Sequence, residues 1–232
     1  MSKKITCILM SLLLSLSFVS CSNNEKNDED LTKEAAVEEK VNSEDDYLQG
    51  EWAEDRTIDD LRSLFEEKAK SVEEVTKKLG VEYTSDEKIK NVDGMQITEN
   101  AIYFDNENPE DNKMESMYFG MNIYGEDLES GDITLKLSLK FNSKEAIENG
   151  DFDIAKTSFV PYIEAFTGKN DKDYSNINNT IIERMKNGEK QVIVDTSTAD
   201  GLKEEYLADE NYIIYKLSTK KFVFADAEMS ME

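Results

Sequence analysis

We expect an α+β protein in which helices pack on an antiparallel sheet, and three observations predict this fold. Residues 58–79 carry apolar side chains at spacings of three and four, the period of an amphipathic helix. Residues 133–141 alternate apolar and polar side chains, the period of a strand with one buried face. The same order, a helix followed by strands, occurs again in the second half of the chain. This order fits one domain or two tandem helix-then-meander units (51–150 and 151–232).

The first helix has both a start signal and a stop signal. Thr57 is placed to cap its N-terminus, Asp60 follows three residues later as in a capping box, and Gly80 comes after the last apolar position. Its apolar stripe consists of Ile58, Leu61, Phe65, Ala69, Val72, Val75 and Leu79. Such a stripe requires a sheet or another helix to cover it.

The remaining elements are expected from shorter patterns. In the first half, strands are expected at 101–104, with 95–98 as an earlier extension, at 117–123 and at 133–141, with residues 125–131 as a turn. Pro161 and Gly168 suit the start and stop of a second helix, and Gly188 closes a third at 177–185. The closing strands are expected at 191–195, 202–207, 212–217 and 221–225.

The first 21 residues have the features of an export signal. A basic start precedes an apolar core from Ile5 to Val19, which is too short and too rich in serine for an ordinary membrane-spanning helix. Phe18-Val19-Ser20-Cys21 resembles the lipobox of bacterial lipoproteins. That resemblance implies cleavage before Cys21 and lipidation of this cysteine, which would hold the protein at the cell membrane by acyl chains of the palmitate type. The alternative is a plain signal peptide or uncleaved anchor in which Cys21 is incidental.

This interpretation divides the chain into three parts. Residues 1–20 would be the signal peptide, and residues 21–50 the lipidated cysteine with an acidic tether that carries too little apolar surface to fold. Residues 51–232 would be the folded domain on the outer side of the membrane.

Composition excludes several classes of function. A net charge of -24 would repel nucleic acid, so no nucleic-acid partner is expected. The chain has no histidine, and its two cysteines, Cys7 and Cys21, lie in the signal and at the lipidation position. Catalysis of the Ser-His-Asp or Cys-His type, an imidazole zinc site and a disulfide are therefore not expected in the mature chain.

Two loops have oxygen ligands spaced somewhat like those of a calcium site. Residues 195–201 offer Asp195 and Asp200, with Glu204 and Glu205 after them, but Ala occupies the fifth position and the glycine comes late for an EF-hand. Residues 105–112 are also rich in oxygen ligands but lack glycine. A polar hairpin turn explains the first loop more simply, and metal binding remains open.

Two further patterns suggest chemistry but have simpler explanations. Residues 85–88 fit Ser-x-x-Lys and residues 174–176 fit Tyr-x-Asn, as in penicillin-binding enzymes, yet the third motif of that family is missing. Met114, Met117 and Met121 could be thioether ligands of copper, but their strand spacing favours Met117 and Met121 as neighbours in the core.

Acidic and aromatic residues supply two more candidates. Asp151 and Asp153 could be paired hydrolase carboxylates, although such pairs are expected by chance in so acidic a chain. A set of aromatic residues could line a groove, but packing within hairpins accounts for it with fewer assumptions. This set is Tyr206, Tyr212, Tyr215, Phe222 and Phe224.

The order of elements resembles cystatin-like folds and the tandem domains of the β-lactamase inhibitory protein and of outer-membrane-assembly lipoproteins. Because only the order is shared, it implies a fold and not a function. The expected function is a non-catalytic surface binding module, without cofactor or catalytic residues, for an envelope protein or a cationic peptide. The alternatives are a small-solute-binding lipoprotein and an envelope hydrolase that uses carboxylates or a metal. The oligomeric state is left open.

Overall fold

A computed structural model describes residues 57–224, except residues 93, 127, 129, 151, 199, 200 and 220 and the side chain of Phe222. The predicted signal peptide, the lipidated Cys21 and the tether lie outside the described residues. Within the described part, no helix is long and apolar enough to span a membrane.

The described residues form helices and strands in the order α-ββββ-α-η-αα-ββββ. The helices are α1 (Ile58–Lys78), α2 (Ser143–Asn149), the short 3-10 helix η1 (Ile154–Lys156), α3 (Phe159–Thr167) and α4 (Ser175–Lys186). The strands are β1 (Thr84–Val92), β2 (Met95–Asp105), β3 (Met114–Tyr124), β4 (Ser130–Lys140), β5 (Gln191–Ser197), β6 (Lys203–Asp209), β7 (Tyr212–Ser218) and β8 (Phe222–Val223).

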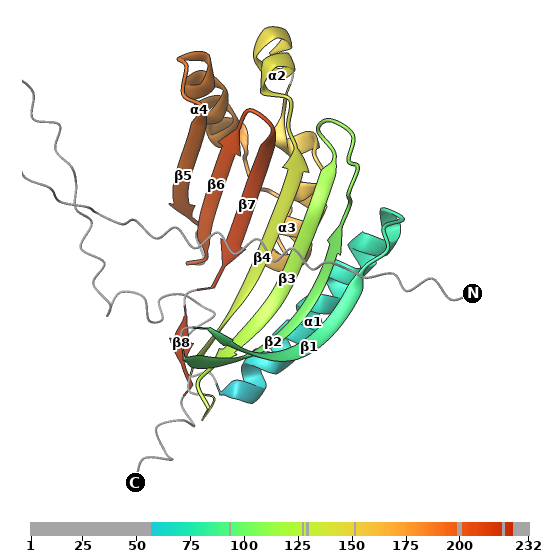
Figure 1. The fold of residues 1–232 in the computed structure, drawn as a ribbon, viewed down its shortest axis with the longest axis vertical. Coiled ribbons are helices and arrows are strands. Elements are labelled where there is room, and N and C mark those ends of the chain that lie inside the picture. The colour runs from blue at the N-terminus through green and yellow to red at the C-terminus, as the bar shows by residue number, and fades with distance from the viewer. Residues whose placement is uncertain are drawn as a thin grey trace, which may run out of the picture. The chain divides into compact units, whose positions relative to one another are not determined.

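All strands belong to one antiparallel sheet with the order β1-β2-β3-β4-β7-β6-β5 (Figure 1). The two meanders meet where β4 pairs with β7, and the two-residue β8 continues along β4 beyond the end of β7. Helix followed by meander thus occurs twice, and both meanders share one sheet and one hydrophobic core. The predicted α+β class is confirmed.

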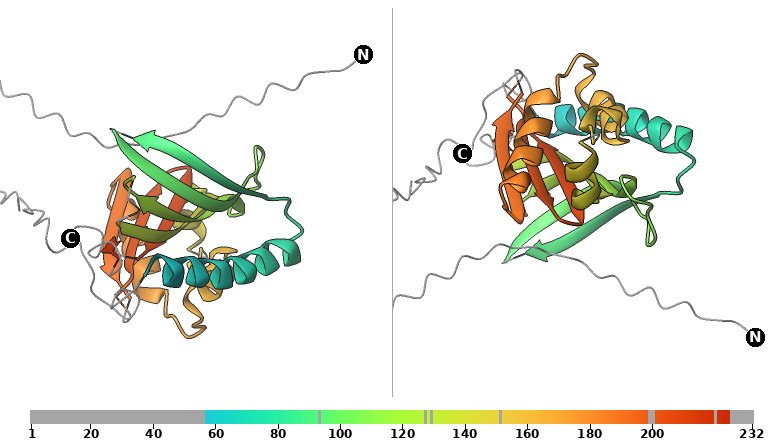
Figure 2. Two further views of the ribbon diagram at one scale, coloured as in Figure 1. Left: turned by 90° about the horizontal axis from the view of Figure 1, so that it is seen from below. Right: turned by 90° about the horizontal axis from the view of Figure 1, so that it is seen from above.

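The helices pack on one face of this sheet, as the end-on views in Figure 2 show. Helix α1 contacts β3 and β4, α3 contacts β4 and α1, and α4 contacts β5. The core between the layers is well packed: the Phe65 ring of α1 stacks on Phe119 of β3 with centroids 5.2 Å apart, and Phe119 is fully buried. Burial of such aromatic side chains contributes about 2–3 kcal/mol each.

Helix α1 begins as the sequence predicts. The Thr57 hydroxyl accepts from the Asp60 N–H at 3.2 Å, and the Asp60 carboxylate accepts from the Thr57 N–H at 2.9 Å. Such a cap is worth about 1 kcal/mol. Leu61, Phe65 and Val72 are buried as expected, but Leu79 follows the helix and is 43% exposed.

The structure corrects four boundaries or assignments. Residues 84–92, for which no strand was expected, form strand β1. Residues 95–105 form one continuous strand, the short helix α2 was not expected, and β8 contains two residues where 221–225 was predicted. Strand β1 escaped prediction because it is an edge strand with mostly exposed polar side chains, so it has no apolar alternation.

Candidate interaction surface

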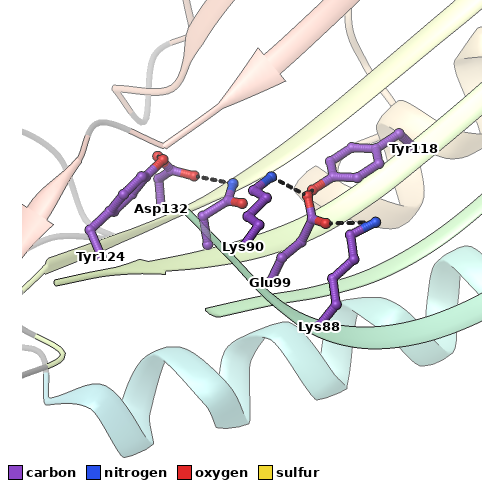
Figure 3. Close-up of polar contacts among 7 residues, drawn as sticks. Lys88, Lys90, Glu99, Tyr118, Tyr124 and Asp132 are labelled. Carbon is purple, nitrogen blue, oxygen red and sulfur yellow. Dashed lines mark hydrogen bonds and ion pairs between the residues drawn. The ribbon is translucent and has the colours of Figure 1, made fainter. Parts of the chain in front are cut away.

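The face of the sheet opposite the helices carries an ordered set of polar and aromatic side chains, here called the open face. Its orientation follows from strand β3, where Met117, Phe119 and Met121 are buried in the core and the alternating residues project the other way. The residues of the open face that interact most closely are Lys88, Lys90, Glu99, Tyr118, Asn122, Tyr124 and Asp132 (Figure 3).

Glu99 on β2 is the centre of the first network on the open face. Its Oε1 accepts from Lys90 Nζ and from the Tyr118 hydroxyl, both at 2.8 Å, and Lys88 Nζ lies 3.0 Å from Oε2. Only 5% of Glu99 is exposed. Burial alone would raise the pKa of Glu99, but the contacts from Lys90, Tyr118 and Lys88 outweigh it and lower that pKa. Oε1 thus accepts two hydrogen bonds, whereas the buried Oε2 accepts none from the described residues and is held by the charge of Lys88.

Asp132 on β4 is the centre of the second network. Its carboxylate accepts from the Tyr124 hydroxyl at 2.6 Å and from Asn122 Nδ2 at 3.0 Å. Lys221 Nζ lies 3.9 Å from the centroid of the Tyr124 ring, within the range of a cation–π interaction. These contacts fix the Tyr124 ring from its hydroxyl and from its face.

Gly120 gives Tyr118 the room to reach Glu99. A Cβ built on Gly120 would lie 2.2 Å from the Tyr118 hydroxyl oxygen and 2.5 Å from Cζ of its ring. The Tyr118 ring therefore lies over Gly120 of the same strand, and in this orientation it leaves no room for a Cβ at that position. This packing converts a flexible side chain into one with a defined orientation.

The chemistry of the open face suits binding. Burial, together with the neighbouring carboxylates Glu99 and Asp132, raises the pKa values of Tyr118 and Tyr124, so both hydroxyls stay protonated at neutral pH and act as donors. Tyrosines whose orientation is fixed contribute contact area at a low entropic cost. Around them the exposed lysines Lys136 and Lys216 lie directly opposite each other on β4 and β7.

The described acids of the two calcium candidates lie on different faces of the sheet or pair with lysines. Asp195 lies in β5, Glu205 projects to the open face, and Glu204 projects to the helix side, where it contacts Lys172 and Tyr215. In the second loop, Asp111 pairs with Lys140. Asp200 lies outside the described residues, and those described include no group of three acidic, histidine or cysteine side chains able to hold a metal.

The penicillin-binding motifs lie apart in the fold. Ser85 is on the edge strand β1, whereas Tyr174 directly precedes α4. The ammonium group of Lys172 lies over the ring of Tyr174 and over that of Tyr215 in β7. The methionines Met117 and Met121 are each 1% exposed, so the prediction that they lie in the core is confirmed.

The last two candidates are placed by their contacts. Asp153 caps η1 by accepting from the Ala155 N–H at 3.0 Å, while Asp151 lies outside the described residues. Tyr206 and Tyr215 are buried with ring centroids 4.8 Å apart, and Phe224 is also buried, so these three are packing residues and do not line a shared open groove.

Sequence reasoning missed the residues that build the open face. The signal for one strand was present, since Tyr118, Asn122 and Tyr124 alternate with the buried residues of β3. Glu99 was not recognised, because its partners lie on β1 and β3 and the strand register that joins them is set by the fold.

A scan against protein-family models found no match to this chain, and searches of curated proteins and of solved structures found no significant match either.

Proposed function

We propose that this chain is an exported lipoprotein, anchored to the cell membrane through lipid on Cys21, whose open face binds an envelope protein without catalysing a reaction. The observation that carries the proposal is the sheet itself, which helices cover on one face while the other displays tyrosines and charges held in place by Glu99 and Asp132. A preordered surface of this kind loses little entropy on binding.

The distribution of charge supports a protein partner over a cationic peptide. The chain is strongly acidic overall, yet on the open face lysines lie beside acids: Lys88 and Lys90 at Glu99, and Lys216 opposite Glu205. A surface with both signs of charge selects a partner with a matching pattern. The acidic tether would give the domain reach from the membrane to such a partner.

In-cell crosslinking of the tagged lipoprotein, followed by mass spectrometry, tests the proposal. The informative variant is Lys136→Glu with Lys216→Glu, which reverses two exposed charges at the centre of the open face. Its matched control is Lys70→Glu with Lys78→Glu, which makes the same charge change on exposed positions of α1. We expect one dominant envelope partner whose capture falls about tenfold or more only in the open-face variant.

Anchoring is tested in the same experiment by Cys21→Ala. If the anchor positions the domain, this variant leaves the membrane fraction and its partner capture falls. Capture of no dominant partner by the wild-type chain, or equal capture by the open-face and α1 variants, would overturn the assignment of the open face as the binding surface.

A further inference from the structure

We infer that a cavity on the helix side of the sheet, beside Glu204, binds a small molecule that carries a primary ammonium group on a short aliphatic stem. This site is separate from the open face and does not depend on the function proposed for it. The cavity has a volume of about 250 Å³ and lies where the segment after α3 meets the β5–β6 connection. Its walls include Ile163, Thr167, Asp171, Asp173, Thr198 and Glu204.

Glu204 is the most buried of the described acidic residues that line the cavity. It is 5% exposed, and its Oε1 accepts from the Tyr215 hydroxyl at 2.7 Å and pairs with Lys172. Its Oε2 accepts no hydrogen bond from the residues that the structure describes. A carboxylate oxygen without a protein donor, on a residue that lines a cavity, can accept a hydrogen bond from a ligand.

The charge of the walls selects a cation. Among the described lining residues, Asp171, Asp173 and Glu204 give three negative charges and Lys169 and Lys172 give two positive charges, a net charge of −1. The Ser175 N–H donates to Asp173 at 2.8 Å, and hydrogen bonding by Ser175 lowers the pKa of Asp173, which keeps it ionised at neutral pH.

The shape of the lining restricts the cation to a small organic one. Ile163 gives an apolar wall for a few methylene groups, while an ammonium group has three N–H donors and can satisfy Glu204 Oε2 together with an acid nearer the rim. A bare metal ion would need three or more ligand side chains close together. The described residues include no group of three histidine, cysteine or acidic side chains placed to hold a metal. The volume is below that of sites for drug-sized ligands, which run from about 300 Å³ upwards.

A short diamine and a free amino acid share this chemistry, and calorimetric titration distinguishes them. The protein is the full chain carrying Cys21→Ala, titrated with butylamine, 1,4-diaminobutane, L-2-aminobutyrate and the uncharged control n-butanol. We expect the amines to bind and butanol not to bind. Tightest binding by the diamine would identify a polyamine-like ligand, and tightest binding by the aminobutyrate would identify an amino acid.

Glu204→Gln tests the role assigned to the buried carboxylate, because the amide keeps its shape and removes its charge. Binding should weaken about tenfold or more, as expected when a charged hydrogen bond is lost. Glu183→Gln is the control, because Glu183 is an exposed glutamate on α4 outside the cavity lining, and it should leave binding unchanged. Should Glu204→Gln fail to fold by circular dichroism, Asp171→Asn at the exposed rim should still weaken binding about threefold.

Three results would overturn the proposal. They are no binding by any of the amines at millimolar concentration, equal binding by butanol, and equal weakening by Glu204→Gln and Glu183→Gln. Loss of binding on the open face in the crosslinking experiment would not affect this result, so the two proposals fail separately.

Discussion

Two glutamates on opposite faces of the same sheet, Glu99 and Glu204, have the same degree of burial and the same kinds of partner. Each is 5% exposed, and each accepts from a tyrosine hydroxyl and pairs with lysine. They differ in where the lysines lie. Glu99 has a lysine beside each carboxylate oxygen, although its buried Oε2 accepts no hydrogen bond from the described residues, whereas both contacts of Glu204 fall on Oε1.

This difference assigns different roles to similar chemistry. Each oxygen of Glu99 already faces a lysine, so Glu99 acts by holding Tyr118 and two lysines in position. A carboxylate with one available oxygen at a cavity can still bind a donor, as proposed for Glu204. Burial of an acid is therefore a poor guide to function unless each of its oxygens is accounted for.

Replacing each glutamate with alanine should produce the largest contrast in stability. Glu204→Ala removes the acceptor of the hydroxyl of Tyr215, which is fully buried, and one partner of Lys172, whose side chain is 25% exposed. Glu99→Ala leaves Lys88 and Lys90, which are 44% and 37% exposed and can return to water. We expect losses of about 3 and about 1–2 kcal/mol in the free energy of unfolding, measured by urea denaturation of the Cys21→Ala chain.

Glu205→Ala is the control for this pair, because Glu205 is the exposed neighbour of Glu204 in β6 and should change stability by less than about 0.5 kcal/mol. If Glu99→Ala lost as much stability as Glu204→Ala or more, the exposure of the remaining partners would not determine the size of the loss, and this prediction would be wrong.

Gly120→Ala should disturb the network around Glu99 without replacing the glutamate itself. The added Cβ would meet the Tyr118 hydroxyl at 2.2 Å, so the ring must swing away from Glu99. We expect a loss of about 1–2 kcal/mol in the free energy of unfolding. A double-mutant cycle with Tyr118→Ala measures the cause: the glycine substitution should cost much less in that background. Additive losses would show that the methyl group acts elsewhere.

The sequence predicted the elements with strong periodicity and missed those defined by pairing. Two sequence signals predict helix α1, its capping box and its stripe of apolar residues. One signal, the alternation of apolar and polar residues, predicts strand β4. Strand β1 was missed because an exposed edge strand needs no apolar face.

Neither glutamate could be singled out from the sequence, although Glu204 was considered as a calcium ligand. Its real partner Lys172 is 32 residues away in the chain, and Glu99 meets Tyr118 across 19 residues. In so acidic a chain, the sequence does not distinguish one glutamate from the others, because the strand register decides which partners each one meets. Composition therefore predicted an acidic surface but not which acids are enclosed.

Acid should weaken the Glu99 network in a predictable direction. Because the pKa of Glu99 in the folded protein is lowered from its usual value of 4.5, its contribution to stability is present above that value and lost as pH falls through the folded pKa. The stability advantage of wild type over Glu99→Gln should therefore shrink as pH is lowered below about 4.5. The change should be under about 1 kcal/mol, since both lysine partners are partly exposed.

Urea denaturation at a series of pH values measures this difference, and Glu87→Gln, an exposed position on β1, is the matched control. An advantage for wild type that grows on acidification would mean that burial outweighs the lysines and that the pKa of Glu99 is raised instead.

The smallest expected effect tests whether the contacts at the rim of the open face add to its order. Lys221→Ala removes the cation above the Tyr124 ring and should cost about 0.5 kcal/mol, whereas Lys221→Arg keeps the interaction and should cost less. Lys216→Ala, an exposed lysine on β7, controls for loss of positive charge alone. Equal losses for the two alanine variants would mean that Lys221 acts through net charge. A loss specific to Lys221→Ala, absent in the Tyr124→Leu background, would place the stabilisation at the aromatic ring, and the order of the open face would then extend from its buried acids to its exposed edge.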